Sequence, residues 1–179
     1  MKANQASTSC RRRVSSGRSS ASAAEDAIQT GLRLLREGRL LGIYPEGTRS
    51  PDGRLYRGKI GVARMALQTG VPVVPVAMVY GSRKLPFGRK LPRARVVFGK
   101  PLDFTRYEGL VGDRFVERSI TDEIMYEIMT LSGQEYVDVY GATVKKTMDA
   151  TGASAPEVLA KLQPPLDESG DRAPTALAG

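Results

Sequence analysis

The chain has 179 residues, of which 41% are hydrophobic and 26% are charged, so a single domain with a sizeable core is expected. It contains no histidine and one cysteine, Cys10. Within this chain, that composition excludes catalytic sites that need an imidazole, the usual zinc ligand sets and an internal disulfide. No metal site is expected.

The positive charge is concentrated in the middle of the chain. The net charge is +8, and residues 33–106 hold 16 basic against four acidic side chains, whereas residues 107–179 hold six basic against 13 acidic ones. An anionic ligand is therefore expected on the central part of the chain.

Hydrophobic periodicity predicts the elements of the first half of the chain. Residues 1–21 are rich in serine and arginine, which is typical of a basic disordered arm. A helix is expected to begin at Ser22, which has capping-box spacing to Glu25, and to end at Gly38. The next expected elements are a short buried strand at Leu40–Tyr44, a glycine-rich polar loop at residues 46–58 and a helix near Lys59–Thr69 ended by Gly70.

The second half predicts further short strands and helices. Val73–Val79 is expected as a buried strand in which Pro75 marks an edge or bulge position. The elements that follow are a basic loop at Ser82–Arg93, a strand at Arg95–Phe98, a helix at Phe115–Leu131 with a core-facing stripe, and a helix at Ala155–Leu162 before a tail. Strands that alternate with amphipathic helices favour an α/β fold in which helices flank a mixed sheet.

Nothing in the sequence predicts a membrane-spanning segment. The most apolar run, Val71–Tyr80, has ten residues and includes two prolines, whereas a spanning helix needs about 20 apolar residues. No secretory signal is recognised in the first 20 residues, so a cytoplasmic protein with peripheral membrane contact is expected. Ser82–Arg95 holds six basic residues with interspersed apolar ones, which suits an anionic membrane surface, CoA phosphates or a solvated loop.

One motif carries chemical information, the loop Tyr44-Pro-Glu-Gly-Thr-Arg-Ser50 after a predicted strand. Ligands bind at strand ends in α/β folds, where loops aim backbone N–H groups at anions. Gly47 permits a positive φ, Arg49 offers a planar fork to phosphate oxygens, and Lys59 opens the next predicted helix. The motif predicts a phosphate pocket, although a turn with a surface Glu46–Arg49 pair explains it equally well.

This motif resembles the third sequence block of the 1-acylglycerol-3-phosphate acyltransferase family, with Tyr44 at its aromatic position. Gly58–Gly61 is similar to the family's Phe-Lys-x-Gly element, with Arg57 in place of the aromatic, and Val71–Val76 resembles its fourth block. The resemblance spans about residues 22–105. It implies a glycerolphosphate acyltransferase-like fold and acyl transfer from acyl-CoA or acyl carrier protein to a lysophosphatidate hydroxyl, without a bound cofactor.

The resemblance also implies which residues bind the acceptor. The residues that would bind the acceptor phosphate or shape its site are Glu46, Gly47, Thr48, Arg49 and Lys59. Pro72 and Pro75 would support the wall behind this site.

The family's first block, His-x-x-x-x-Asp, is absent, because the chain contains no histidine. In that block the histidine deprotonates the acceptor hydroxyl and the aspartate orients the histidine. The family's second block is not recognised either. Residues 1–20 look as though sequence unrelated to the family replaces the segment that normally precedes the first helix. We therefore expect a family member that is incomplete at the N-terminus and impaired in catalysis, with Glu46 and Asp103 as the carboxylates that could replace the base.

The expected organisation has three parts. They are a basic arm at residues 1–21, an acyltransferase-like α/β domain at residues 22–132 and a C-terminal extension at residues 133–179, partly disordered from about residue 163. The expected partners are a lysophosphatidate-like acceptor, an acyl thioester donor and an anionic membrane surface, but no nucleic acid. A non-catalytic lysophospholipid-binding protein is the main alternative, and charge alone supports a nucleic-acid binder.

Overall fold

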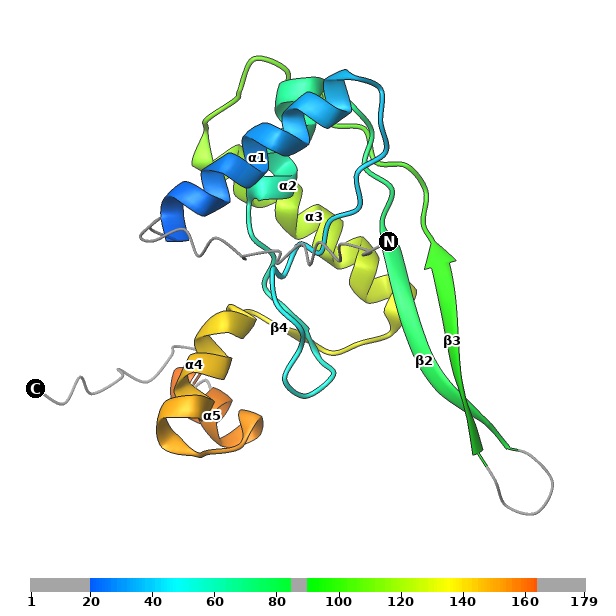
Figure 1. Ribbon diagram of the computed structural model, residues 1–179, viewed down its shortest axis with the longest axis vertical. Coiled ribbons are helices and arrows are strands. Elements are labelled where there is room, and N and C mark those ends of the chain that lie inside the picture. Colours follow the sequence, from blue (N-terminus) through cyan, green and yellow to red (C-terminus); the bar gives the residue numbers. More distant parts are fainter. Residues whose placement is uncertain (1–19, 85–89, 164–179) are drawn as a thin grey trace, which may run out of the picture.

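The computed structural model describes residues 20–84 and 90–163. In chain order its elements are α1 (Ser20–Arg36), β1 (Leu55–Tyr56), α2 (Gly61–Thr69), β2 (Val76–Lys84), β3 (Lys90–Phe98), the 3-10 helix η2 (Thr105–Tyr107), α3 (Arg114–Ser132), β4 (Tyr136–Val137), α4 (Gly141–Thr151) and α5 (Ala155–Leu162) (Figure 1). The α/β class is confirmed. The strands form two separate pairs, β1 with β4 in parallel and β2 with β3 in antiparallel orientation.

Some sequence predictions lie outside the described residues. They concern the basic arm up to residue 19, the centre of the basic loop at residues 85–89 and the tail from residue 164.

Helices α1, α2 and α3 were all predicted, with small differences at their starts. Helix α1 begins at Ser20, so Ser22 lies inside the helix and is not its cap. The reason is that the small residues before Ala24 contain no helix breaker. Helix α2 begins at Gly61, two residues after Lys59, and Gly70 ends it in the left-handed conformation.

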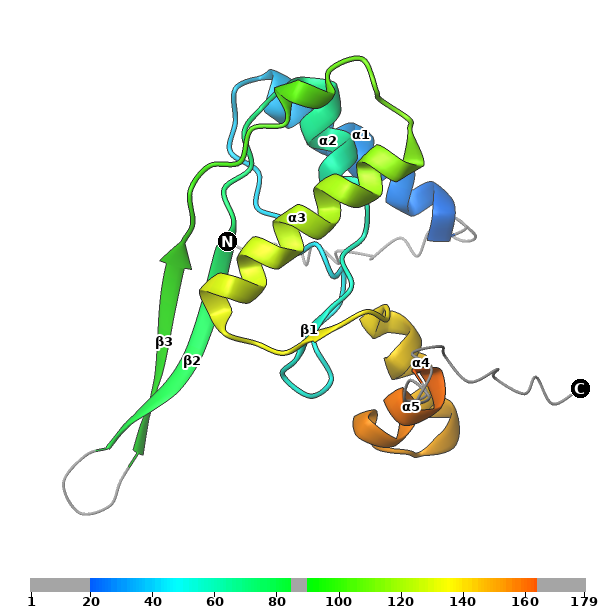
Figure 2. The same cartoon turned by 180° about the vertical axis from the view of Figure 1, so that it is seen from behind.

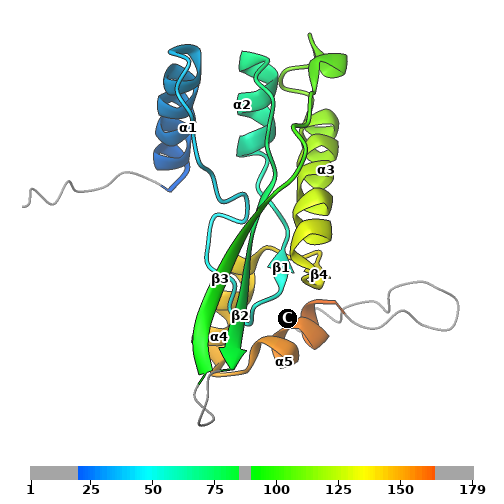
Figure 3. The same ribbon diagram turned by 90° about the vertical axis from the view of Figure 1, so that its right-hand side faces the viewer.

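The three helices lie side by side (Figure 3), and α3 runs from this group to the β2–β3 hairpin (Figure 2). The predicted stripe of α3 is confirmed as core, because Ile120 and Ile124 are buried and Ile128 packs against them. The buried members of this core are Val62, Ala63, Ala66, Phe104, Ile120 and Ile124. Asp113 caps α3 by accepting the N–H groups of Phe115 and Val116.

The strand predicted at Val73–Val79 begins only at Val76. Val73 makes an isolated bridge to Leu102, and Pro75, which has no N–H to donate, accepts the Gly99 N–H at 2.8 Å. The strand is also not buried on both faces as predicted. Ala77 faces the core, whereas alternate side chains face outwards in the hairpin.

The strand predicted at Leu40–Tyr44 is wrong. These residues form no ladder with any described strand, and the Leu40 side chain is 99% exposed. An apolar run becomes a strand only when a neighbour supplies hydrogen bonds to its backbone. Leu41 and Ile43 instead line a shallow apolar groove against α1 and Met65.

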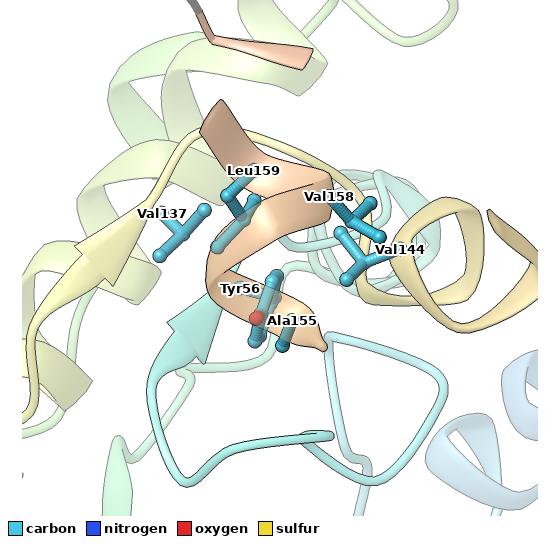
Figure 4. Close-up of a cluster of buried hydrophobic side chains, with 6 residues drawn as sticks. All are labelled: Tyr56, Val137, Val144, Ala155, Val158 and Leu159. Atoms are coloured by element: carbon cyan, nitrogen blue, oxygen red, sulfur yellow. The ribbon is translucent and has the colours of Figure 1, made fainter. Parts of the chain in front are cut away.

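The C-terminal part adds elements that the sequence did not reveal. Helix α5 was predicted with its correct bounds, but α4, β1 and β4 were not. Together they enclose a second core that consists of Tyr56, Val137, Val144, Ala155, Val158 and Leu159 (Figure 4). Tyr56 is the member of this core that comes from the N-terminal half of the chain. Within the described ranges, no helix combines the length and apolarity needed to cross a bilayer.

Candidate functional site

The motif loop, which we define as residues 45–59, is closed at its base by backbone hydrogen bonds. The Gly47 N–H donates to the Tyr44 carbonyl oxygen at 3.0 Å, and the Lys59 N–H donates to the Pro45 carbonyl oxygen at 2.8 Å. The first bond closes a turn at the beginning of the loop, and the second brings the beginning and the end of the loop together. They also mean that the Gly47 N–H is used within the loop and is not available to a ligand.

Gly47 allows the Lys59 side chain to cross directly over the turn. The glycine has a φ of +67°, and a Cβ atom at this position would lie 2.9 Å from Lys59 Cε and 3.0 Å from Lys59 Nζ. Any other residue would therefore be strained in its backbone and would displace the lysine. Two of the residues that the resemblance assigns to the acceptor site, Gly47 and Lys59, thus lie in contact.

Glu46 is held by the strand that follows the motif. Its Oε2 atom accepts the Tyr56 N–H at 2.8 Å, and the side chain is half-buried. Burial raises the pKa of Glu46, although the Tyr56 hydrogen bond partly opposes this shift. Glu46 makes no ion pair with Arg49, so the interpretation of the motif as a surface Glu–Arg pair is wrong.

Arg49 is exposed. Among the described residues, its guanidinium has neither a hydrogen-bond nor an ion-pair partner. The neighbouring Thr48 side chain is half-buried and lies against Gly141, the first residue of α4. The loop thus carries an unpaired arginine two residues after the glycine that Lys59 crosses, and two such cations in one loop favour an anion.

A tight turn at Asp52 completes the loop before β1. Asp52 accepts hydrogen bonds from Arg54 Nε at 2.8 Å and from the Tyr56 hydroxyl at 3.0 Å. Burial alone would raise the pKa of Asp52, but the hydrogen bonds from Arg54 and Tyr56 outweigh it and lower the pKa. Burial and the Asp52 carboxylate raise the pKa of Tyr56 to about 12, so its hydroxyl remains a donor at neutral pH.

The far end of the loop is packed against α3. A Cβ atom at Gly58 would lie 2.8 Å from Met125 Sδ, so only glycine fits at this close approach. The Gly58 carbonyl oxygen accepts from Arg118 Nη1 at 2.7 Å, and Arg118 is also paired with Asp122. The backbone next to Lys59 is therefore held against α3 by packing and by a hydrogen bond.

The remaining predicted residues are separate from this loop. Pro75 is buried next to Gly99 at the base of the hairpin, whereas Pro72 is exposed. Asp103 is exposed and accepts the Thr105 N–H at 2.8 Å. That hydrogen bond lowers the pKa of Asp103, which makes it a weaker base than Glu46.

Sequence reasoning missed several residues that shape the loop. Asp52, with Gly53 after it, carries a turn signature that could have been used. Tyr56 and Gly141 carry no such signature, because their importance comes from contacts across about 85 residues of chain.

Comparison with known proteins shows a family similarity for the first half of the chain. Residues 5–79 match the family model described as Acyltransferase. This part of the chain is similar to the acyltransferase family. The match ends within β2. It also includes residues 5–20, which precede the region of about residues 22–105 where the motifs resemble the family.

Three relatives of this segment are named as 1-acyl-sn-glycerol-3-phosphate acyltransferases. The segment is 36% identical over 81 residues to the chloroplastic 1-acyl-sn-glycerol-3-phosphate acyltransferase BAT2 of Brassica napus, covering 43% of this chain and 24% of the relative. It is 36% identical over 77 residues to the 1-acyl-sn-glycerol-3-phosphate acyltransferase of Bacillus subtilis, covering 42% and 37%. A human enzyme, 1-acyl-sn-glycerol-3-phosphate acyltransferase beta, is 48% identical over 52 residues, covering 29% and 18%.

The aligned parts are short compared with the relatives. The chain spans about a quarter of the length of the first curated acyltransferases that it matches. No solved structure gives a significant match.

Proposed function

We propose that the motif loop binds the phosphate of a lysophosphatidate acceptor, in a protein of the type that transfers an acyl group from acyl-CoA or acyl carrier protein. The observation that carries this proposal is the unpaired, exposed Arg49 next to the Gly47 turn, over which Lys59 lies. An arginine and a lysine in one loop suit a doubly charged phosphate. The names of the relatives support a glycerol phosphate acceptor.

We further propose that this chain alone transfers the acyl group slowly or not at all. It contains no histidine, and a positioned general base contributes about 10²–10⁴-fold to the rate. Glu46 is the better of the two candidate carboxylates because burial raises its pKa. However, its Oε2 atom is engaged by the Tyr56 N–H, so we assign it to the structure of the loop. A lysophospholipid-binding protein without turnover is the alternative that this absence of histidine favours.

The proposal is tested with the purified chain in two parallel assays. Calorimetry measures binding of a short-chain lysophosphatidate below its critical micelle concentration, and a thiol-release assay measures acyl transfer from acyl-CoA. We expect saturable binding without measurable turnover. Rapid turnover would contradict the proposed lack of a base, and absence of binding would contradict the proposed phosphate site.

We also propose that the chain associates peripherally with an anionic membrane through the outward face of the hairpin. The register places Val76 opposite Phe98 and Met78 opposite Val96. Tyr80 and Phe98 are 74% and 69% exposed on this face. Residues 82–95 carry six basic and no acidic residues, and basic residues next to an exposed apolar face favour anionic lipid surfaces.

Replacing both Tyr80 and Phe98 with serine is expected to weaken binding to phosphatidylglycerol vesicles at least about tenfold, since each ring contributes roughly 1 kcal/mol or more when buried. Vesicle sedimentation measures the effect. Phe115→Ser is the matched control, because Phe115 is 84% exposed at the start of α3 and lies outside the hairpin. Equal binding of the double variant and the control would show that the hairpin face is not the membrane surface.

A further inference from the structure

Residues 134–141, which lie outside the acyltransferase match, run alongside the motif loop. The Leu55 N–H donates to the Glu135 carbonyl oxygen at 2.9 Å, and the Arg57 N–H donates to the Val139 carbonyl oxygen at 3.1 Å. These bonds flank the parallel pairing of β1 with β4. The later segment therefore supplies the strand partner that β1 needs in order to exist.

Side chains hold the same two segments together. Gln134 Nε2 donates to the Gly53 carbonyl oxygen at 2.6 Å. The Arg57 guanidinium lies 5.4 Å from the centre of the Tyr140 ring, and its Nε atom is 3.5 Å from Asp138. The position where the family carries an aromatic residue is thus occupied by an arginine that stacks on an aromatic ring of the C-terminal segment.

Tyr56 connects the C-terminal core to the motif. Its side chain is enclosed by Val137 and by residues of α4 and α5 (Figure 4). Its backbone N–H donates to Glu46 Oε2 at 2.8 Å. The C-terminal core therefore fixes Tyr56, and Tyr56 in turn fixes Glu46 at the beginning of the motif loop.

Gly141, the first residue of α4, lies against the motif itself. A Cβ atom at Gly141 would lie 3.1 Å from Thr48 Cγ2, which is tighter than ordinary van der Waals contact, and 3.4 Å from Tyr56 Cβ. The glycine lets α4 begin directly behind Thr48, the residue that precedes Arg49. A single added methyl group would push Thr48 outwards.

We propose that the segment at residues 134–141 positions the motif loop for phosphate binding, with Gly141 as the positioning residue. The choice of ligand rests on the proposed function, whereas the contacts between residues 134–141 and the motif loop do not depend on it. It gives the C-terminal extension a role in the acceptor site, although the extension carries no motif of its own.

The test is Gly141→Ala, alone and combined with Thr48→Ser, which removes the Cγ2 atom that the new methyl group would meet. Gly42→Ala is the matched control, because a Cβ atom there meets nothing within 4 Å. Alanine is favoured over glycine in helices, so a weakened site cannot be explained by loss of helix propensity in α4. Affinity for a short-chain lysophosphatidate is measured by calorimetry, and amide hydrogen exchange is measured over residues 46–59.

We expect Gly141→Ala to weaken binding about fivefold and to speed exchange in the loop, with little change in melting temperature. This corresponds to about 1 kcal/mol of binding free energy. The double variant is expected to restore wild-type hydrogen exchange over residues 46–59, and Gly42→Ala to equal wild type in both measurements. Unchanged exchange in Gly141→Ala, or no recovery in the double variant, would overturn the positioning role. If the wild-type chain binds no lysophosphatidate, the proposed function fails while the exchange data still decide the role of Gly141.

Discussion

Replacing Arg64 with methionine is expected to lower the free energy of unfolding by about 3 kcal/mol. Arg64 Nε lies 3.0 Å from both carboxylate oxygens of Glu117, which is only 1% exposed between α2 and α3. Removal of the arginine leaves a buried carboxylate without its cation. Because the Arg64 side chain is itself 32% exposed, some water can reach the pair, which places the effect at the lower end of the range for buried pairs.

Urea denaturation measures this effect, and two controls define its cause. Arg106→Met breaks the exposed Arg106–Glu123 pair and should change stability by less than about 1 kcal/mol. The double variant Arg64→Met, Glu117→Leu removes both charges and should recover most of the loss. A double variant that is as unstable as Arg64→Met would show that packing, and not the unpaired charge, explains the result.

Replacing Arg49 with alanine is expected to weaken lysophosphatidate binding about 10–100-fold. A hydrogen bond to a charged group contributes about 1.5–3 kcal/mol, and each 1.4 kcal/mol is a factor of about ten. Because Arg49 is exposed and has no partner among the described residues, the stability of the fold should change by less than about 0.5 kcal/mol. Binding and folding are therefore separable at this position.

Calorimetry on Arg49→Ala, Arg49→Lys and Arg114→Ala tests this expectation. Arg49→Lys keeps the charge but loses the planar fork, so an intermediate affinity is expected. Arg114 is another exposed arginine, at the start of α3, and its removal should leave binding within twofold of wild type. Equal losses in Arg49→Ala and Arg114→Ala would indicate that net charge alone governs binding.

The long helices could be predicted because their signals are local. Helix α3 was predicted from a repeated apolar stripe, which is buried in the structure, and its ends lie at an aspartate cap and a glycine that are also local signals. The same logic located α5. In contrast, α4 contains four threonine or glycine residues and only Val144 and Met148 as large apolar residues, which gives too weak a period to recognise.

The strands show why pattern alone is insufficient for β structure. Leu40–Tyr44 has the composition of a buried strand, yet it lacks a strand partner among the described residues. Strands β1 and β4 have two residues each, which is too short for any alternation to be visible. In each case the outcome depends on a neighbour that is distant in the sequence.

In the candidate site, too, local features could be predicted from the sequence, whereas contacts with distant residues could not. The positive φ that Gly47 permits is present in the structure, because it follows from the residue type, whereas the crossing of Lys59 over this glycine was not predicted. The motif also did not predict that Glu46 accepts the Tyr56 N–H, or that Gly141 lies behind Thr48. These contacts depend on a C-terminal segment that carries no motif, so only the fold reveals them.

The most direct measurement of the central claim compares two ligands that differ only in the phosphate. The purified chain is titrated with a short-chain lysophosphatidate and with the monoacylglycerol that carries the same acyl group. We predict saturable binding of the lysophosphatidate and at least tenfold weaker binding of the monoacylglycerol, as loss of one charged contact requires. Equal affinity for the two lipids would show that the loop around Arg49 does not recognise phosphate.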